Sequence, residues 1–306
     1  MGKVLIAMSG GVDSSVAAYL LKHSGWDCVG ATMTLYRNED IGISRSRTCC
    51  SLEDVEDARS VAFRLRIPYY VFNFSDEFRR QVMDRFADAY GQGRTPNPCI
   101  DCNRYLKFRH LYDRAALLGC DAIVTGHYAR IERENGRYLL KKALDASKDQ
   151  SYVLYMLTQE QLAHTQFPLG ALRKAETRQL ADSLGFFNAR KPDSQDICFV
   201  LDGDYAAFIR RHTGKADTPG DFVDESGRIL GRHRGIAHYT IGQRKGLGIP
   251  SNQPLYVKAI DPKSNQVVLS ENDALFSQQL TGENFNWIAW EAPPRQFRCS
   301  AKIRYR

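Results

Sequence analysis

A glycine- and serine-rich loop directly after the first apolar run constrains this chain more than any other feature of its sequence. Val4–Met8 is a continuous apolar segment of strand length, and the loop that follows reads Ser9-Gly10-Gly11-Val12-Asp13-Ser14-Ser15. From Val16 to about Gly25, apolar residues recur at helical spacing. A strand, a glycine-rich turn and a helix in this order open a βαβ unit, so we expect the chain to begin as an α/β protein.

The loop has the chemistry of a phosphate site. Gly10 and Gly11 can both adopt positive φ, which turns successive backbone N–H groups toward one anion. The helix that opens near Ser14 adds its N-terminal N–H groups and the positive end of its dipole. Ser9 and Ser14 supply hydroxyl donors, and Asp13 is a candidate ligand for Mg²⁺ on the phosphates. The loop matches neither Walker A nor GxGxxG, and a tight turn without a ligand is the alternative interpretation.

Segments of strand and helix type continue to alternate as far as Arg130. The predicted strands after the first are Cys28–Leu35, Tyr69–Phe74 and Ala122–Thr125. The predicted helices start at Ser51, at Asp76 and after a proline-bounded loop, Arg94–Cys102. Such alternation predicts a parallel sheet with helices on both faces. The carboxyl ends of its strands then share one edge, which is where ligands bind in such sheets.

The pattern changes after Arg130. We expect Arg130–Lys141 to form a hairpin that turns at Asn135-Gly136, and the next two segments, Tyr152–His164 and Lys174–Leu184, to be helices. From about Asp202 helical periodicity fades, and after Pro254 strand-like runs appear: Leu255–Ile260, Gln266–Leu269, Phe285–Trp290 and Cys299–Tyr305. We therefore expect an α/β domain (1–200), a central module (201–262) and a C-terminal antiparallel β-barrel (263–306), incomplete because the chain stops inside a strand-like run.

Charge and composition narrow the classes of protein further. All of the net charge of +7 lies in residues 227–306, which contain 12 Lys and Arg against five Asp and Glu. A basic region beside a neutral body favours a polyanionic partner, and an ordinary solvated basic surface is the alternative. The sequence has neither an apolar run long enough to span a membrane nor a signal-peptide core. We therefore expect a cytoplasmic protein without a membrane partner, whose cysteines have redox, metal or catalytic roles.

Motifs along the whole chain match one family. The loop Ser9–Ser15 resembles the pyrophosphate loop (PP-loop) of the ATP pyrophosphatases, which cleave ATP to AMP and pyrophosphate while adenylating a substrate. The chain further resembles the tRNA 2-thiouridylases (MnmA or TrmU) in Arg94-Thr95-Pro96-Asn97-Pro98, Cys102-Asn103, Thr125-Gly126-His127-Tyr128, Lys148-Asp149-Gln150-Ser151-Tyr152, Asp193-Ser194-Gln195-Asp196-Ile197-Cys198-Phe199, Tyr239–Gly248 and Arg304-Tyr305-Arg306. This resemblance implies a parallel-sheet PP-loop ATPase domain, then a small central module and a partial antiparallel β-barrel.

The resemblance implies an ATP-dependent sulfurtransferase that thiolates C2 of the wobble uridine in tRNA. By matching positions, the residues expected to bind ATP and Mg²⁺ are Ala7, Met8, Ser9, Gly10, Gly11, Val12, Asp13, Ser14, Met33 and Gly126. The residue pattern alone supports Gly126, which ends a predicted strand, but favours a core position for Met33. The residues expected to contact tRNA or its target base are Asn97, Pro98, Cys99, Lys148, Asp149, Gln150, Arg304 and Tyr305.

The resemblance also makes Cys102 the catalytic nucleophile and Cys198 the carrier of a persulfide. Adenylation turns uracil O2 into a leaving group, the persulfide sulfur attacks C2, and Cys102 takes up the sulfur of Cys198 in a disulfide. A reductant then resets the enzyme. A cysteine desulfurase or a sulfur relay protein is the expected sulfur donor.

Cys99 departs from the family pattern, because many members have Asp at this position. A thiol cannot serve as the same acid or base at neutral pH. Cys99, Cys102 and Cys198 instead offer three thiolates, enough for a [4Fe–4S] cluster with one open iron, and zinc is a further alternative. The persulfide and cluster mechanisms both stay open at this point. Among the other cysteines, the contexts predict core positions for Cys28, Cys120 and Cys299, and no functional role for Cys49 and Cys50.

Further RNA contacts are expected from the basic turn Arg244-Lys245-Gly246. Tyr105 or Tyr128 could stack on an exposed base, although core packing is the simpler role for both. Two other functions fit the same motifs. One is another PP-loop adenylating enzyme, such as an amidotransferase-type synthetase or an enzyme that thiolates tRNA elsewhere. The other is an RNA- or metal-binding module with a vestigial nucleotide site, which the intact Ser9–Ser15 loop argues against.

Overall fold

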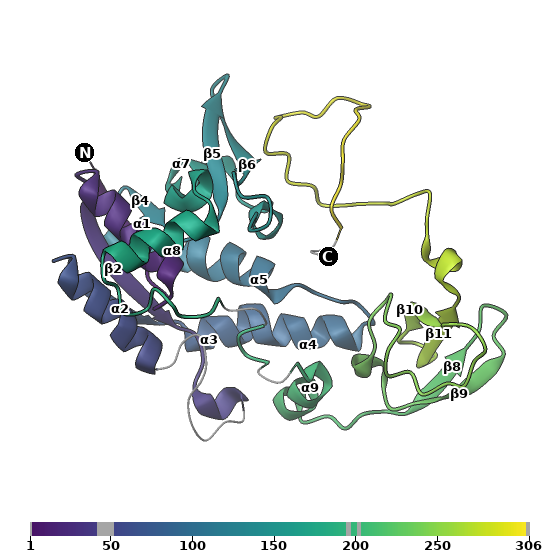
Figure 1. The fold of residues 1–306 in the computed structure, drawn as a ribbon. Helices are drawn as coiled ribbons and strands as arrows, with labels where there is room; N and C mark the ends of the chain where they lie inside the picture. Colours follow the sequence, from purple (N-terminus) through teal and green to yellow (C-terminus); the bar gives the residue numbers. More distant parts are fainter. Residues whose placement is uncertain (1, 42–51, 194–196, 201–202, 304–306) are drawn as a thin grey trace.

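The computed structural model describes residues 2–41, 52–193, 197–200 and 203–303. Its first sheet has five strands, all paired in parallel, in the order β3-β2-β1-β4-β7 (Figure 1). These strands are β1 (Lys3–Ala7), β2 (Asp27–Thr34), β3 (Tyr69–Asn73), β4 (Ala122–Val124) and β7 (Thr165–Gln166). The predicted parallel α/β sheet is confirmed, and the two-residue β7 is an edge strand that the sequence did not predict.

Strand β1 is buried on both faces, because its alternate side chains enter two different hydrophobic clusters. Val4 and Ile6 belong to one cluster and Leu5 to the other. The layer of helices over Val4 and Ile6 consists of α1 (Val12–His23), α2 (Leu52–Arg64) and α8 (Lys174–Ser183). The loop between β1 and α1 therefore starts from a rigid, fully packed strand.

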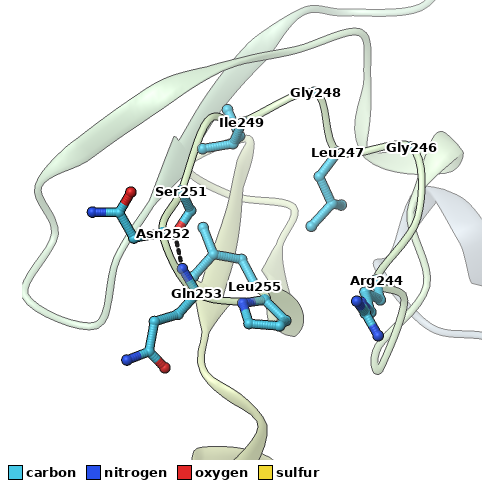
Figure 2. Close-up of a pocket in the computed structure, with 10 residues that line it drawn as sticks. Arg244, Gly246, Leu247, Gly248, Ile249, Ser251, Asn252, Gln253 and Leu255 are labelled. Carbon is cyan, nitrogen blue, oxygen red and sulfur yellow. Dashed lines mark hydrogen bonds between the residues drawn. The ribbon is translucent and has the colours of Figure 1, made fainter.

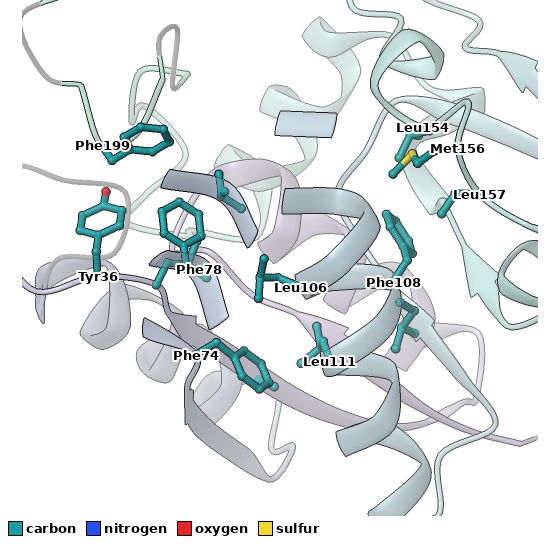
Figure 3. Close-up of a cluster of buried hydrophobic side chains, with 14 of the residues drawn as sticks. Tyr36, Phe74, Phe78, Leu106, Phe108, Leu111, Leu154, Met156, Leu157 and Phe199 are labelled. Atoms are coloured by element: carbon teal, nitrogen blue, oxygen red, sulfur yellow. The ribbon is translucent and has the colours of Figure 1, made fainter. Parts of the chain in front are cut away.

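Two long helical segments cover the other face, and each contains wide π-helical turns. They are α3 (Ser75–Phe78), the π-helical stretch Arg79–Met83 and α4 (Asp84–Gly91), then α5 (Pro98–Asp101), the π-helical stretch Cys102–His110 and α6 (Leu111–Leu117). Figure 3 shows Phe78, Leu106 and Phe108 from these segments in the larger hydrophobic cluster. Such turns are frequent at functional sites, and Cys102 opens the second stretch.

A hairpin and several short turns connect β4 to α8. β5 (Ala129–Glu134) and β6 (Arg137–Lys142) pair antiparallel, with positive φ at Asn135 (50°) and Gly136 (82°), so the predicted hairpin and its turn are confirmed. The predicted helix Tyr152–His164 is wrong over most of its length. It is replaced by a 3₁₀ turn (Ser151–Val153) and by α7 (Gln159–Ala163), which starts late because the Thr158 side chain caps it.

The second, smaller sheet lies in the C-terminal part of the described chain. Its strands are β8 (Gly220–Val223), β9 (Ile229–His233), β10 (Tyr256–Asp261) and β11 (Gln266–Ser270), in the order β10-β11-β8-β9. Two antiparallel hairpins, β8–β9 and β10–β11, are joined by a parallel pairing of β8 with β11. Phe222, Tyr239 and Val257 are among the buried residues of its core. The expected fold class, an α/β domain followed by a smaller β unit, is confirmed.

Two of the predicted C-terminal strands are wrong. Phe285–Trp290 and the described part of Cys299–Tyr305 form bends and irregular backbone. In the first of these segments, the carbonyls of residues 287, 288 and 290 accept hydrogen bonds from the side chain of Arg137, and Gln159 adds one to residue 288. Phe285 and Trp287 stack on each other, with 4.7 Å between ring centroids. Side-chain donors and ring packing therefore take the place of a strand partner.

Helix α9 (Tyr205–Thr213) forms where helical periodicity was expected to fade. The carboxylate of Asp204 accepts a hydrogen bond from the backbone N–H of Ala207, which caps the first turn. The remaining short helical turns are Asn38–Ile41, Pro168–Ala171, Ile236–His238 and Asn272–Leu275. In the described part of the chain, no helix is both long enough and apolar enough to cross a membrane.

Candidate active site

The loop between β1 and α1 is shaped by one glycine rather than two. Gly10 has a φ of +73°, and a Cβ at this position would lie 2.4 Å from the backbone oxygen of Asp54. Gly11 instead has a φ of −88° and serves as the N-cap of α1, where no described side chain caps the helix. The expectation of positive φ at Gly11 is therefore wrong. The uncapped helix end leaves its first N–H groups available to an anion.

Side chains inside the loop fix its conformation. Ser14 Oγ accepts a hydrogen bond from the backbone N–H of Ser9 (3.1 Å) and donates one to the carbonyl of Gly11 (3.0 Å). The Asn188 side-chain amide donates to the carbonyl of Gly10 (3.0 Å) and to Ser15 Oγ (2.9 Å). Asn188 is 2% exposed, and its contacts to the loop were not predicted from the sequence. The loop is thus preorganised before any ligand binds.

The end of β4 lies directly beside the loop, because β1 and β4 are neighbours in the sheet. A Cβ on Gly126 would lie 2.9 Å from both the carbonyl carbon of Asp13 and the backbone nitrogen of Ser14. Strand order reverses between β1 and β4, which is the place where open parallel sheets bind ligands. The predicted contact of Gly126 with this site therefore has a geometric basis. Met33, near the end of β2, packs against the larger hydrophobic cluster.

The carboxylate of Asp13 is held by two groups. Lys174 Nζ lies 2.7 Å from each of its oxygens, and Tyr128 donates a hydrogen bond to Oδ1 over 2.9 Å. Burial and the charge of Asp13 raise the pKa of the Tyr128 hydroxyl, so this group is a proton donor at neutral pH. Tyr128 is thereby a buried loop contact rather than an open stacking platform. Sequence reasoning missed Lys174.

Cys99 and Cys102 lie at the start of the second helical segment. The Asn97 side chain accepts a hydrogen bond from the backbone N–H of Cys99 (3.0 Å), and Pro98 occupies the first helical position. Cys99 is exposed, whereas Cys102 is half-buried against the larger hydrophobic cluster. Burial raises the pKa of Cys102 to about 11; Lys107 opposes this rise, and Cys99 and Asp101 add to it.

Cys198 is fixed by its neighbours on the same hydrophobic cluster. The Tyr36 hydroxyl donates a hydrogen bond to the carbonyl of Cys198 (2.7 Å). Phe199 is 1% exposed and contacts Phe78 edge-on, with 5.6 Å between the rings (Figure 3). Cys102 and Cys198 both pack against this cluster, and both are reduced cysteines. The structure thus brings the two predicted sulfur residues onto one side of the sheet.

Three of the residues predicted to contact tRNA, Lys148, Asp149 and Gln150, form contacts within the chain. Lys148 pairs with Asp193 at 2.9 Å. Asp149 accepts hydrogen bonds from the backbone N–H of Ala143 and the hydroxyl of Ser151. The Gln150 side-chain oxygen accepts a hydrogen bond from the backbone N–H of Tyr128, and the backbone N–H of Gln150 donates one to the carbonyl of Tyr128. The turn that these three residues form also contacts the residue after Cys102, the predicted nucleophile, because the Asn103 side chain donates a hydrogen bond to the carbonyl of Val153 (2.9 Å).

The C-terminal end of the described chain returns to this turn. Tyr152 donates a hydrogen bond to the carbonyl of Ile303 (3.3 Å), and the ammonium of Lys302 lies 5.9 Å from the centre of the Tyr152 ring. Arg304 and Tyr305, two more of the predicted tRNA contacts, lie outside the described residues, as do Cys49 and Cys50. The last described residues thus lie next to the segment that contains Lys148.

The basic turn predicted from Arg244-Lys245-Gly246 borders a hollow of about 380 Å³ in the second sheet region (Figure 2). Its lining residues are Arg244, Gly246, Leu247, Gly248, Ile249, Ser251, Asn252, Gln253, Pro254 and Leu255. Lys245 is exposed beside it. Tyr105, the other candidate for base stacking, is half-buried and lies under the guanidinium of Arg85 at 5.2 Å.

The three thiols considered for a metal cluster do not form a metal site. Cys99, Cys102 and Cys198 all lie within the described residues, and across that part of the chain no three His, Cys, Asp or Glu groups lie close enough to hold a metal ion. A [4Fe–4S] cluster or zinc on these cysteines therefore does not fit this arrangement. Cys28 and Cys120 are buried, as predicted, whereas Cys299 is exposed, so its predicted core position is wrong.

Comparisons with known proteins identify relatives along almost the whole chain. Residues 2–202 match the family model described as the tRNA methyl transferase HUP domain, and residues 206–271 match the tRNA methyl transferase PRC-barrel domain. The tRNA-specific 2-thiouridylase MnmA of Clostridioides difficile is 50% identical over 99% of this chain and 84% of its own length. MnmA 1 of Thermoanaerobacter sp. is 53% identical over 99% of this chain and 84% of its own length. MnmA of Lachnoclostridium phytofermentans is 52% identical over 100% of this chain and 86% of its own length.

Similarity to solved structures is weaker. A 4-thiouridine synthetase–RNA complex with bound ATP has a TM-score of 0.44 and 22% identity, over 65% of this chain and 45% of that chain. This structural match does not contribute to the family assignment, which rests on the relatives that match nearly the whole chain. Identity of about half of all residues over nearly the whole chain establishes shared descent. The chain belongs to the tRNA-specific 2-thiouridylase (MnmA) family.

Proposed function

We propose that this chain is an ATP-dependent tRNA sulfurtransferase that converts the wobble uridine to 2-thiouridine. The observation that carries the proposal is the preorganised Gly10–Ser14 loop at the switch point between β1 and β4, on a sheet whose other layer holds Cys102 and Cys198. The relatives named tRNA-specific 2-thiouridylase support the substrate and the reaction. A wobble uridine suits such a site, since bases of an anticodon loop can leave the stack without breaking a duplex.

The loop residues would bind the polyphosphate of ATP. Backbone N–H groups around Gly10 and Gly11 and the uncapped start of α1 supply donors for the phosphates, and Ser9 adds an exposed hydroxyl. Gly126 lets the end of β4 approach the loop closely. Asp13 is the carboxylate that would hold Mg²⁺, and its second oxygen would keep the contact with Lys174. ATP, when bound, supplies the adenylyl group that makes uracil O2 a leaving group.

A phosphate-binding loop favours thiolation over methyl transfer, the reaction in the description of the matching family models. A methyltransferase takes its methyl group from S-adenosylmethionine, which carries no phosphate. A cradle of N–H groups at a helix N-terminus would then have no anion to bind. Adenylation of the base uses that cradle directly, because pyrophosphate must be held as it leaves.

Cys198 and Cys102 would carry out the sulfur transfer. The terminal sulfur of a Cys198 persulfide attacks C2, and AMP leaves with the former O2. The Cys102 thiolate then attacks Cys198 Sγ, which forms the Cys102–Cys198 disulfide and leaves the transferred sulfur on C2. Since no metal site forms at these cysteines in the described residues, the persulfide is the mechanism we propose. A cysteine desulfurase or a relay protein would reload Cys198 after reduction.

The proposal is tested by incubating the purified chain with an unmodified tRNA transcript, ATP and a persulfide donor. We expect AMP and 2-thiouridine to form in equal amounts, and Cys198→Ser to abolish 2-thiouridine. Cys299→Ser, which changes an exposed cysteine outside the site, is the matched control and should retain activity. Methylated uridine formed from S-adenosylmethionine, or small-molecule adenylation without RNA, would refute the proposal in favour of another enzyme class.

A further inference from the structure

A cluster of charged side chains joins the phosphate loop to Asp193, and the reaction above assigns no role to Lys174 or Asp193. Lys174, in the first turn of α8, is only 8% exposed. Its ammonium lies 2.7 Å from both oxygens of Asp13 and 2.8 Å from Oδ1 of Asp193. One buried lysine therefore joins the phosphate loop to a residue five positions before Cys198.

Asp193 is the junction of this cluster. Besides Lys174, its Oδ1 accepts a hydrogen bond from Arg178 (2.7 Å), and its Oδ2 accepts one from Lys148 (2.9 Å). Burial raises the pKa of Asp193, but the hydrogen bonds from Lys174 and Lys148 outweigh it and hold the pKa at about 2. The carboxylate thus stays charged at any working pH. One cation is enough to balance the charge of the Asp193 carboxylate. The main effect of the second and third contacts is therefore to fix the position of this carboxylate.

The contacts of Asp193 connect three parts of the proposed reaction. Asp13 belongs to the phosphate loop, Lys148 belongs to the turn predicted to contact tRNA, and the chain beyond Asp193 leads to Cys198. We name the contacts Asp13–Lys174–Asp193–Lys148 the ionic chain. Removing one member leaves a half-buried charge without its partner, which costs far more than a surface ion pair gains. Loss of Asp193 would therefore remove the side-chain link between Lys174 and the backbone five residues before Cys198.

We propose that Asp193 and Lys174 are positioning residues that couple adenylation of the base to sulfur transfer, because the ionic chain fixes Asp193, five residues before Cys198, relative to the phosphate loop. The inference rests on the proposed function. A sulfur nucleophile misplaced by about 1 Å loses on the order of a hundredfold in rate. Water then attacks the adenylated base instead, which regenerates uridine and releases AMP without thiolation.

The experiment compares AMP and 2-thiouridine formed by the full chain and by Asp193→Asn with tRNA transcript, ATP and a persulfide donor. The unmodified chain should release one AMP for each 2-thiouridine. Asp193→Asn should raise this ratio by about tenfold or more, while the KM for ATP changes by less than about threefold. Lys174→Met should raise both the ratio and the KM, because Lys174 also contacts Asp13, and Lys174→Arg should restore the ratio in part.

Two controls separate positioning from a purely structural role. Lys141→Met removes a lysine that also bridges two carboxylates, Glu132 and Glu134, on the β5–β6 hairpin, and should leave the ratio unchanged. Arg178→Gln removes a contact of Asp193 that does not involve Asp13, and should raise the ratio even if Asp193→Asn fails to fold.

The outcomes are distinct. If Asp193→Asn and Arg178→Gln fold, as judged by thermal unfolding, and lose AMP and 2-thiouridine in proportion, the ionic chain only stabilises the fold and the inference is overturned. If the unmodified chain makes no 2-thiouridine, the proposed function itself fails.

Discussion

Cys102 and Gly126 are both constrained by the residues that pack against them: burial raises the pKa of the Cys102 thiol, and Gly126 has no room for a side chain. Packing against the larger hydrophobic cluster keeps Cys102 protonated, with its pKa raised to about 11 chiefly by burial. Gly126 faces the backbone of the phosphate loop, where no Cβ fits. Both constraints arise from residues distant in sequence, and both have measurable consequences.

The reactivity of Cys102 should depend steeply on pH. Only the thiolate reacts with an alkylating agent, and a pKa raised from 9.0 to about 11 leaves the thiolate scarce at neutral pH. The rate of iodoacetamide labelling at Cys102, followed by peptide mass spectrometry, should therefore rise about tenfold per pH unit from pH 7 and level off only near pH 11. A plateau below pH 9 would show that burial does not control this thiol.

Replacing Gly126 by alanine should weaken ATP binding. The new Cβ would lie 2.9 Å from two backbone atoms of the loop, so the loop must move. Overpacking of this kind costs about 1–3 kcal/mol, which corresponds to a rise of roughly 5- to 150-fold in the KM for ATP. Gly91→Ala, at the end of α4, is the control for a glycine change, because Gly91 has no positive φ and, apart from its own helix and chain neighbour, no described atom lies within 4 Å of the new Cβ. An unchanged KM in Gly126→Ala would remove Gly126 from the site.

The sequence predicts some of these residues and not others for a physical reason. The loop from Ser9 to Ser14 is local, so its residue types show its chemistry directly. Lys174 and Asn188 contact the loop across sequence separations of 161 and 178 residues, and an isolated Lys or Asn in a helical or polar stretch gives no local signal. The assignments of Cys102, Cys198 and the tRNA contacts stay predictions.

The second helical segment, which starts at α5, is the element on which the proposed sulfur chemistry depends most. Asn97 caps it, Pro98 fixes its first turn, and Cys102 opens its π-helical stretch. The position of Cys102 therefore depends on how this segment begins. Before the other long segment, which starts at α3, the N-cap is Phe74, and Asn73 accepts a hydrogen bond from the backbone N–H of Ser75 (3.0 Å).

Loss of the Asn97 cap should affect both stability and activity. Asn97→Ala removes the acceptor for the N–H of Cys99, and loss of an Asn cap lowers the free energy of unfolding by about 1 kcal/mol, measurable by urea denaturation. Asn73→Ala should cost a similar amount. Thiolation by Asn97→Ala should fall well below that of Asn73→Ala, because only the segment that starts at α5 contains Cys102. Equal activity of the two variants would contradict this role.

Elements with strong local patterns are predicted well, and those formed by distant partners are not. The apolar runs of β1, β2 and β4 and the Asn135-Gly136 turn are visible in the sequence. The strand β7 has two residues and is defined by its pairing with β4. In the segment 285–290, backbone carbonyls accept hydrogen bonds from side chains such as that of Arg137 instead of pairing with a strand. The domain limits at 200/201 and 262/263 stay predictions; the β10–β11 hairpin crosses the second one.

Across the whole molecule, charge and topology divide the proposed work between two regions. The PP-loop and both sulfur residues belong to the five-stranded sheet and its helices, whereas the net charge of +7 comes from residues 227–306. Segment 286–303 returns to the first region, where Asn286, for example, donates hydrogen bonds to the carbonyls of Tyr155 and Leu157. This arrangement is suited to a large anionic substrate that contacts both regions.

Binding of tRNA should therefore weaken with salt, and the exposed Lys245 should contribute to that dependence. Each phosphate contact releases counterions, so Lys245→Ala should reduce the slope of log K against log salt by about 0.7 to 0.9. Lys22→Ala, in the last turn of α1, is the control for loss of one positive charge. Equal slopes for Lys245→Ala and the unmodified chain in filter-binding assays would show that this turn does not contact RNA.

The central claim is that a nucleotide activates the C2 oxygen of uridine so that sulfur can displace it. A tRNA transcript with ¹⁸O at O2 of the wobble uridine tests this most directly, with the AMP analysed by mass spectrometry after a single turnover. We predict that each AMP formed with 2-thiouridine carries one ¹⁸O in its phosphate, because the oxygen leaves bonded to phosphorus. Unlabelled AMP, with 2-thiouridine formed all the same, would contradict the account.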